Sequence, residues 1–176
     1  MTDPRIDLIQ SRIRDVPDFP KPGIIFKDIT PVLADGAAFG ACIDLMAEKQ
    51  DKNSFDVIVA MEARGFIFGA ALAAKLGKGF VPVRKPGKLP WQTHQMEYEL
   101  EYGTDKVEMH KDGVLPKQRV LIVDDLIATG GTAWAACELV KALRGTVVGA
   151  CFLIELSFLP GRERIESVPV SSVIVY

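Results

Sequence analysis

Residues 120–132 read Val-Leu-Ile-Val-Asp-Asp-Leu-Ile-Ala-Thr-Gly-Gly-Thr. The four apolar residues at the start of this stretch predict a strand buried on both faces of a parallel sheet. Asp124 and Asp125 stand at the C-terminal end of that strand, a loop of small residues follows, and residues 133–144 are compatible with a helix. A strand, two acids, a glycine loop and a helix in this order favour a phosphate site.

The loop after the acids has the residue types of an anion site. Gly130 and Gly131 can take positive φ angles and let backbone N–H groups approach an anion closely, and Thr129 and Thr132 add hydroxyl donors. The helix behind the loop offers its partly positive N-terminus. No Lys-Ser or Lys-Thr pair follows the glycines and GxGxxG is absent, so the loop is neither a Walker A motif nor a dinucleotide fingerprint.

The spacing of acids and loop suits a ribose that carries a 5′-phosphate. Asp124 and Asp125 precede the loop by the length of one sugar, so their carboxylates would accept hydrogen bonds from the 2′- and 3′-hydroxyls while the loop holds the phosphate. The alternative is a buried strand that ends in a solvated acidic turn and binds nothing.

Apolar periodicity and breaking residues predict the remaining elements. Helices are expected over 3–14, over 35–50 with Asp35 as the N-cap, and over 66–76 with Gly77 as the C-cap; strands are expected over 24–26, 55–61, 80–84, 119–123, 146–156 and 173–175. This alternation predicts an α/β fold with a parallel sheet. Ligands of such sheets bind beyond the carboxyl ends of the strands, where the polar clusters 62–64, 84–85 and 124–125 fall.

Residues 85–113 differ from the rest of the chain. Apolar side chains alternate with glutamates from residue 96 to 102, a turn follows at 103–105, and the alternation resumes from residue 107, which predicts a two-stranded hairpin. A long excursion of this kind above a sheet is often a lid. The alternative is a surface β-arm or a dimer contact.

The composition bounds the function. The 176 residues, 48% hydrophobic and 25% charged, are expected to form one globular domain, 1–176. A net charge of −2 argues against nucleic-acid binding, which needs a basic face. Cys42, Cys137 and Cys151 lack metal-ligand spacing and are expected to be buried, reduced thiols. Without a secretory apolar region or an apolar stretch of the roughly 18 residues that a span needs, a cytoplasmic protein that does not enter membranes is expected.

The stretch 120–132 resembles the PRPP-binding signature of the type I phosphoribosyltransferases, where PRPP is phosphoribosyl pyrophosphate. Residues 17–31, PDFPKPGIIFKDITP, resemble the N-terminal signature of the branch of that family that acts on adenine, as do 62–66, 83–90 and 100–103. The resemblance runs from about Ile6 to the last residue. It implies the type I phosphoribosyltransferase fold: a central, mostly parallel sheet flanked by helices, an N-terminal hood segment over 1–31 that binds the base, and a flexible β-hairpin lid over 85–113.

The resemblance also implies an activity. The enzyme would be a pentosyltransferase that joins adenine to PRPP and releases AMP and pyrophosphate, in purine salvage. Mg²⁺ would be the cofactor, bound mainly through PRPP near Asp124 and Asp125 without a dedicated protein metal site, and the chain would form a homodimer. The alternatives are the same reaction on hypoxanthine, guanine or xanthine, and a PRPP-sensing regulator, which would need a DNA-binding module and a basic face.

The resemblance assigns roles to individual residues. The ligands of PRPP and AMP would be Arg64, Arg84, Lys85, Lys88, Asp124, Asp125, Ala128, Thr129, Gly130, Gly131 and Thr132. Adenine would lie between Phe26 and Leu126, with backbone groups near Ile25 and Lys27 reading its edge. Glu101 would be the general acid/base, and Tyr102 would pack as the lid closes.

Each of these roles has a purely structural alternative. Arg64 would be a surface arginine paired with Glu62, and the basic residues of 84–88 a solvated charge cluster. Phe26 would be a core aromatic. Glu101 would be one of several glutamates on a solvated hairpin face.

Overall fold

The structure is a computed structural model that describes residues 3–99 and 104–176. The chain forms two compact units, Met1–Leu45 and Met46–Tyr176, and each is described by itself. The prediction of one domain over 1–176, with a hood segment over 1–31, stays a prediction.

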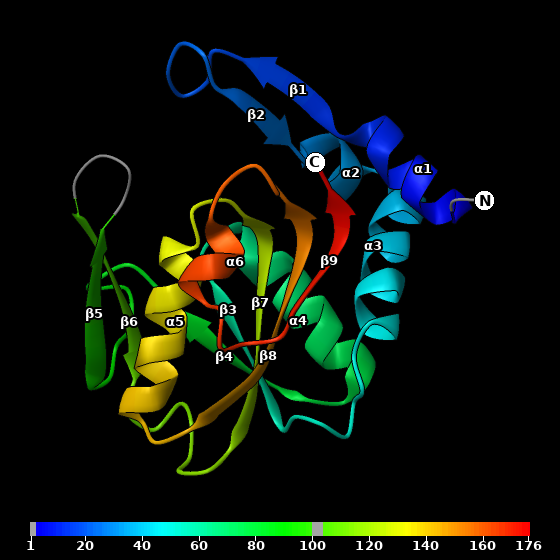
Figure 1. Cartoon of the computed structure of the whole chain (residues 1–176). Coiled ribbons are helices and arrows are strands. Elements are labelled where there is room, and N and C mark those ends of the chain that lie inside the picture. The colour runs from blue at the N-terminus through cyan, green and yellow to red at the C-terminus, as the bar shows by residue number, and fades with distance from the viewer. Residues whose placement is uncertain (1–2, 100–103) are drawn as a thin grey trace. The chain divides into compact units, whose positions relative to one another are not determined.

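The larger unit is built on a five-stranded sheet in the order β4-β3-β7-β8-β9 (Figure 1). Its strands are β3 Val57–Met61, β4 Gly79–Val83, β7 Arg119–Ile127, β8 Thr146–Glu155 and β9 Val170–Val175. All four neighbouring pairs are parallel, which confirms the predicted parallel sheet. The middle strand, β7, carries the stretch that suggested the fold, and its residues 120–123 are buried, as the apolar run predicts.

Helices cover both faces of this sheet. They are α4 Arg64–Leu76, α5 Gly131–Ala142 and the short α6 Gly161–Arg164. Successive strand residues face opposite sides: Val57 and Val59 belong to the apolar cluster that includes α5, whereas a Cβ at Gly69 of α4 would lie 2.5 Å from the Cβ of Ala60. Helices α4 and α5 therefore pack on opposite faces and begin just after the carboxyl ends of β3 and β7.

A two-stranded antiparallel hairpin packs against α5. It consists of β5 Thr93–Glu99 and β6 Thr104–His110, paired from Thr93↔His110 to Glu99↔Thr104. Tyr98, Val107 and Met109 are buried in the same apolar cluster as α5. The predicted hairpin is confirmed over the described residues, and its action as a lid stays a prediction.

The buried carboxylate of Glu108 fixes the base of the hairpin. Its Oε1 accepts backbone N–H donors of Gly87 at 3.0 Å and Leu89 at 3.3 Å. Its Oε2 accepts the Thr93 hydroxyl at 3.0 Å and the Gln95 amide at 3.1 Å. Glu108 thus holds the loop after β4 and the start of β5 together.

The smaller unit contains α1 Pro4–Arg12, β1 Arg14–Pro17, β2 Ile25–Asp28, α2 Thr30–Ala34 and most of α3 Gly36–Glu48. Strands β1 and β2 form an antiparallel ribbon. The predicted N-cap of α3 is confirmed, because Asp35 Oδ1 accepts the N–H groups of Ala37 at 3.0 Å and Ala38 at 3.1 Å. Strand β1 and helix α2 were not predicted, because both are too short to show a period.

Several boundaries differ from prediction, three of them at the carboxyl edge of the sheet. Strand β7 does not end at Val123 but continues to Ile127, because β8 keeps pairing with it through Asp124↔Phe152 and Ile127↔Glu155. Helix α4 begins at Arg64 instead of residue 66, and α5 begins at Gly131 instead of residue 133. The two acids therefore belong to the strand itself.

Other expectations are confirmed. Gly77 ends α4 in the left-handed conformation at φ +66°. Cys42, Cys137 and Cys151 are free thiols, and each is buried. Among the described residues, no helix has the length and apolar character that crossing a membrane requires.

Candidate functional site

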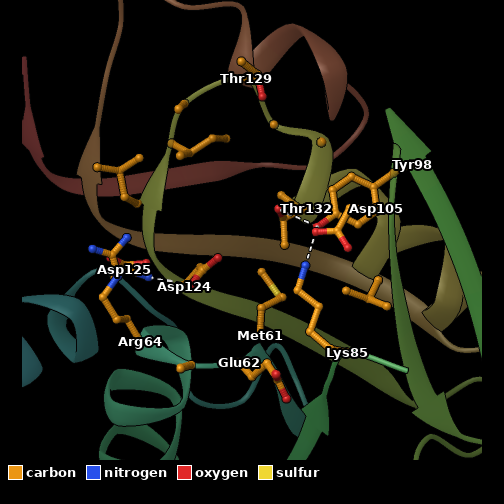
Figure 2. Close-up of a pocket in the computed structure, with 18 residues that line it drawn as sticks. Met61, Glu62, Arg64, Lys85, Tyr98, Asp105, Asp124, Asp125, Thr129 and Thr132 are labelled. Atoms are coloured by element: carbon orange, nitrogen blue, oxygen red, sulfur yellow. Dashed lines mark hydrogen bonds and ion pairs between the residues drawn. The ribbon is translucent and has the colours of Figure 1, made fainter. Parts of the chain in front are cut away.

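A cavity of about 490 Å³ lies at the carboxyl ends of the central strands, next to the first turns of α4 and α5 (Figure 2). Most of the residues predicted to bind PRPP line it. They are Arg64, Lys85, Asp124, Asp125, Ala128, Thr129, Gly130, Gly131 and Thr132, and Leu126 lines it with them. Arg64 and the two acids lie on one side of the cavity in the view of Figure 2, and Lys85 and Thr132 on the other.

The two acids are held close together and away from water. Asp125 is buried and Asp124 half-buried, and the Asp125 backbone N–H donates to Asp124 Oδ1 at 2.9 Å. Burial raises the pKa of Asp124 well above its ordinary value, and the neighbouring Asp125 carboxylate raises it further. Burial also raises the pKa of Asp125, which Arg64 opposes. The ionised form of the pair is therefore unfavourable in the empty site, and hydroxyl donors or a cation would stabilise it.

Arg64 begins α4 and faces these acids. Its Nε lies 2.9 Å from Asp125 Oδ2. The predicted alternative, a surface pair between Arg64 and Glu62, is not what the structure shows, because Glu62 Oε2 accepts Arg84 Nε at 2.6 Å. The next residue, Gly65, must be a glycine, because a Cβ there would lie 2.5 Å from Asp124 Oδ1.

The loop from Ala128 to Thr132 connects β7 to α5 as predicted. Gly130 has φ +76°, and a Cβ on it would lie 2.5 Å from the carbonyl oxygen of Gly161. Gly130 is also the N-cap of α5 and has no side chain with which to cap the first N–H groups. Helix N-termini of this kind bind phosphates through their N–H groups and their partial positive charge.

The hairpin adds two polar side chains to the cavity that sequence reasoning missed, besides the apolar Val107. The Tyr98 hydroxyl donates to Asp105 Oδ2 at 3.2 Å and accepts the Thr132 hydroxyl at 3.5 Å, and Asp105 forms an ion pair with Lys85. In the sequence, Tyr98 is one of several apolar residues in alternation and Asp105 part of a turn, so no signal there marked either one.

The remaining predicted residues are placed elsewhere. Arg84 and Lys88 are not among the described residues that line the cavity, and the Arg84 Nη1 donates to the carbonyl of Lys88 at 3.2 Å. Glu101 and Tyr102 lie outside the described residues.

The residues predicted to bind adenine, apart from Leu126, lie on β2 of the smaller unit. Ile25 is exposed, the ring of Phe26 meets that of Phe19 edge-to-face at 5.1 Å, and Lys27 Nζ lies 2.7 Å from Asp15 Oδ1. Phe26 is half-buried.

The cavity combines three kinds of group. Carboxylates suit sugar hydroxyls, a glycine loop at a helix N-terminus suits a phosphate monoester, and Arg64 and Lys85 suit a second anionic group. Over residues 3–99 and 104–176, no cluster of three or more His, Cys, Asp or Glu side chains could hold a metal ion by itself. The arrangement fits a sugar that carries phosphate groups at both ends.

Comparisons with known proteins agree with this chemistry. Residues 29–171 match the phosphoribosyl transferase domain. The chain is 56% identical over 171 residues to the adenine phosphoribosyltransferase of Thermoanaerobacter pseudethanolicus, covering 97% of this chain and 99% of that one. It is 58% identical over 164 residues to that of Thermotoga maritima, covering 93% and 95%.

Solved structures give the same result. The crystal structure of the Thermoanaerobacter pseudethanolicus protein matches with a TM-score of 0.95 over 97% of this chain and 99% of that one, at 56% identity. The Saccharomyces cerevisiae adenine phosphoribosyltransferase, solved with an imino-altritol bisphosphate and adenine, matches with a TM-score of 0.89 at 39% identity over 97% and 98% of the chains. The chain therefore belongs to the phosphoribosyl transferase family, among the adenine phosphoribosyltransferases.

Proposed function

We propose that this chain transfers the 5-phosphoribosyl group of PRPP to adenine, giving AMP and pyrophosphate, as a purine-salvage enzyme. The observation that carries the proposal is one cavity in which Asp124, Asp125 and the loop 128–132 lie together. Identity of 56% across nearly the whole chain to proteins of this name supports it. The fit is to a phosphorylated ribose in general, and the choice of adenine rests on the relatives.

The sugar phosphate has a place in this cavity. The N–H groups at the start of α5 and the hydroxyls of Thr129 and Thr132 bind the 5′-phosphate, while Asp124 and Asp125 accept hydrogen bonds from the ribose hydroxyls. As the bond between C1′ and pyrophosphate breaks, positive charge develops on the ribose ring. The two carboxylates stabilise that charge because the fold already fixes them beside it, with Asp125 buried and Asp124 half-buried.

The leaving group needs cations. Arg64 and Lys85 line the cavity and bind the pyrophosphate. The resemblance adds Arg84 and Lys88 to these ligands. Their charges stabilise the negative charge that pyrophosphate gains as it leaves.

Mg²⁺ fits this site as a partner of the substrate. Two adjacent carboxylates offer the hard oxygen ligands that Mg²⁺ prefers, and Mg²⁺ is commonly bound through one or two carboxylates together with substrate phosphates. When bound, it neutralises pyrophosphate charge. Asp124 and Asp125 are the residues that would hold it.

Base recognition and proton transfer rest on the resemblance. The resemblance assigns stacking on adenine to Phe26 and to Leu126, and it assigns to backbone groups near Ile25 and Lys27 the distinction between an amino and an oxo group. The purine ring nitrogen attacks C1′ and loses its proton, and Glu101 accepts that proton as general base, with Tyr102 packing over the site as the hairpin closes. We propose further that the enzyme is a cytoplasmic homodimer.

A turnover assay tests the proposal. Pyrophosphate release should depend on PRPP and magnesium and should be fastest with adenine in a panel that also contains hypoxanthine, guanine and orotate. Well-folded protein that binds neither PRPP nor AMP would contradict the proposal. A preference for another base would show that adenine is not the substrate.

Two variants should separate binding from chemistry. Asp125→Asn should weaken PRPP binding, because a ribose and cation ligand is lost, whereas Glu101→Gln should lower kcat with the Kd of PRPP little changed. Asp56→Asn is the matched control: Asp56 pairs with Arg119 at 2.6 Å and is not among the described residues that line the cavity. Full turnover by Glu101→Gln would reject its assignment as the general base.

A further inference from the structure

The hairpin places a carboxylate inside the cavity where the substrate's phosphates bind. Asp105 lies near the start of β6, directly across the hairpin from Tyr98, and both line the cavity together with Lys85 and Thr132. Figure 2 shows these four side chains converging on the side of the cavity opposite Arg64. Asp105 is half-buried, with 27% of its side chain exposed.

The groups around Asp105 are those that bind phosphate. Lys85 contributes an ammonium ion, Tyr98 a hydroxyl at 3.2 Å, and the backbone N–H of Lys106 donates to Oδ1 at 2.8 Å. Burial opposes ionisation of Asp105, but the hydrogen bonds from Lys85 and Lys106 hold its pKa below the ordinary value. Asp105 is therefore an anion surrounded by anion-binding donors.

We propose that Asp105 holds the Lys85 ammonium group in an ion pair while the site is empty, and that the pyrophosphate group of the substrate takes the place of the Asp105 carboxylate. The inference rests on the proposed function, because it takes pyrophosphate as the ligand of Lys85. Lys85 cannot give its full charge to a phosphate while it neutralises Asp105, and a phosphate beside an unmoved Asp105 would be repelled. Asp105 is thus a positioning residue that acts through Lys85 and lowers the affinity of the site for the pyrophosphate group of the substrate.

Pyrophosphate is the displacing group rather than the 5′-phosphate. Lys85 contacts Asp105 directly, whereas Thr132 of the phosphate loop reaches it only through the Tyr98 hydroxyl. Removing the Asp105 charge should therefore change pyrophosphate binding more than ribose 5-phosphate binding, and adenine, which has no phosphate, should bind unchanged.

The test is calorimetry of the full chain with inorganic pyrophosphate, ribose 5-phosphate and adenine in the presence of magnesium. Asp105→Asn should bind pyrophosphate more tightly than the wild type, by up to about fivefold, the upper end of what a partly exposed ion pair gives, and its KM for PRPP should fall with it. Tyr98→Phe removes a donor to Asp105 and keeps the charge, so it should give a smaller change of the same sign.

Two comparisons separate displacement from a general charge effect. Glu97→Gln removes the same charge from the next cross-strand pair, where Glu97 Oε2 lies 2.9 Å from Lys106 Nζ outside the cavity, and should leave pyrophosphate binding unchanged. In a Lys85→Met background, Asp105→Asn should lose most of its effect, because no lysine is left to release.

The outcomes are distinct. Equal or weaker pyrophosphate binding by Asp105→Asn overturns the inference. So does an equal gain in pyrophosphate affinity in Glu97→Gln, or an undiminished gain from Asp105→Asn in the Lys85→Met background. A gain in affinity that is larger for ribose 5-phosphate than for pyrophosphate overturns it as well. A wild-type protein that folds but binds neither PRPP nor pyrophosphate would instead contradict the proposed function.

Discussion

At the scale of the residue, Asp124 is kept where its charge is unfavourable. Burial and the Asp125 carboxylate raise its pKa above the ordinary 3.8, so the folded chain holds a proton there more tightly than the unfolded chain does. The folded protein therefore loses stability as the pH rises from 3.8 to the pKa of Asp124 in the folded state. Above that folded-state pKa the full cost is present. We attribute this cost to the need for a carboxylate beside the ribose.

Asp124→Asn should accordingly stabilise the protein near neutral pH. An asparagine Oδ1 can still accept the Asp125 N–H, while the buried charge is gone, so the unfolding midpoint should rise by roughly 2–4 °C for each 1 kcal/mol relieved. The gain should shrink as the pH falls and disappear near pH 3.8, as thermal unfolding followed by circular dichroism would show. Asp56→Asn should not raise the midpoint, because hydrogen bonds from Arg119 lower the pKa of Asp56 to about 2. A neutral-pH midpoint for Asp124→Asn at or below that of the wild type would refute this reading.

At the scale of the element, the hairpin depends on one buried carboxylate. Burial opposes the charge of Glu108, but hydrogen bonds from Thr93, Gln95, Leu89 and Gly87 lower its pKa below the ordinary 4.5. Its stabilising effect is therefore complete above pH 4.5 and is lost as the pH falls through the folded pKa. The loop that carries Lys85 and the start of β5 share this anchor.

Glu108→Gln should loosen the hairpin. The NH2 group of the glutamine amide would face donors whose hydrogen bonds the Glu108 carboxylate now accepts. We therefore expect the free energy of unfolding to fall by about 1–3 kcal/mol at neutral pH, with faster hydrogen exchange confined to β5, β6 and the loop after β4. The difference from the wild type should narrow in acid. Glu97→Gln on the same hairpin breaks an exposed pair with Lys106 and affects a hydrogen bond with Thr104, and it should exchange like the wild type. Unchanged exchange in Glu108→Gln would show that Glu108 is no anchor.

Elements with a long period or a strong breaker could be predicted from the sequence, whereas the short elements β1, α2 and α6 could not. The apolar run before Asp124 predicted the central strand, and Asp35 and Gly77 marked helix ends. The predicted end of β7 was wrong because two acids in a row are typical of the residues that follow a strand. Pairing with the neighbouring β8 keeps both acids within β7. Tyr98 and Asp105 could not be recognised as cavity residues, because that depends on how the hairpin packs on α5.

At the scale of the whole molecule, each compact unit contains a buried thiol. Cys42 belongs to the smaller unit, and Cys137 and Cys151 to the larger one. Burial raises the pKa of Cys42 to about 12 and those of Cys137 and Cys151 to about 11. The thiolate is the reactive form, so the native protein should protect all of them.

A thiol reagent should thus report how each unit opens. At pH 8 the native chain should not react, and full unfolding in urea should release all 3 thiols. Cys42 should react at lower urea than the others, because a unit of Met1–Leu45 buries a smaller fraction of its surface than one of Met46–Tyr176. Cys42→Ser and a Cys137→Ser, Cys151→Ser double variant assign the phases; prompt reaction of the native chain would contradict the burial.

Strand β7 runs on through Asp124 and Asp125, with β8 hydrogen-bonded along that length. The backbone of these two residues, which we propose as the sugar ligands, is therefore ordered by folding and not by substrate arrival, so little conformational entropy remains to be lost there on binding. On the proposed function, selectivity for ribose over other sugars would be set by this preorganised edge of the sheet, and changes in distant loops would alter which base is accepted without weakening sugar binding.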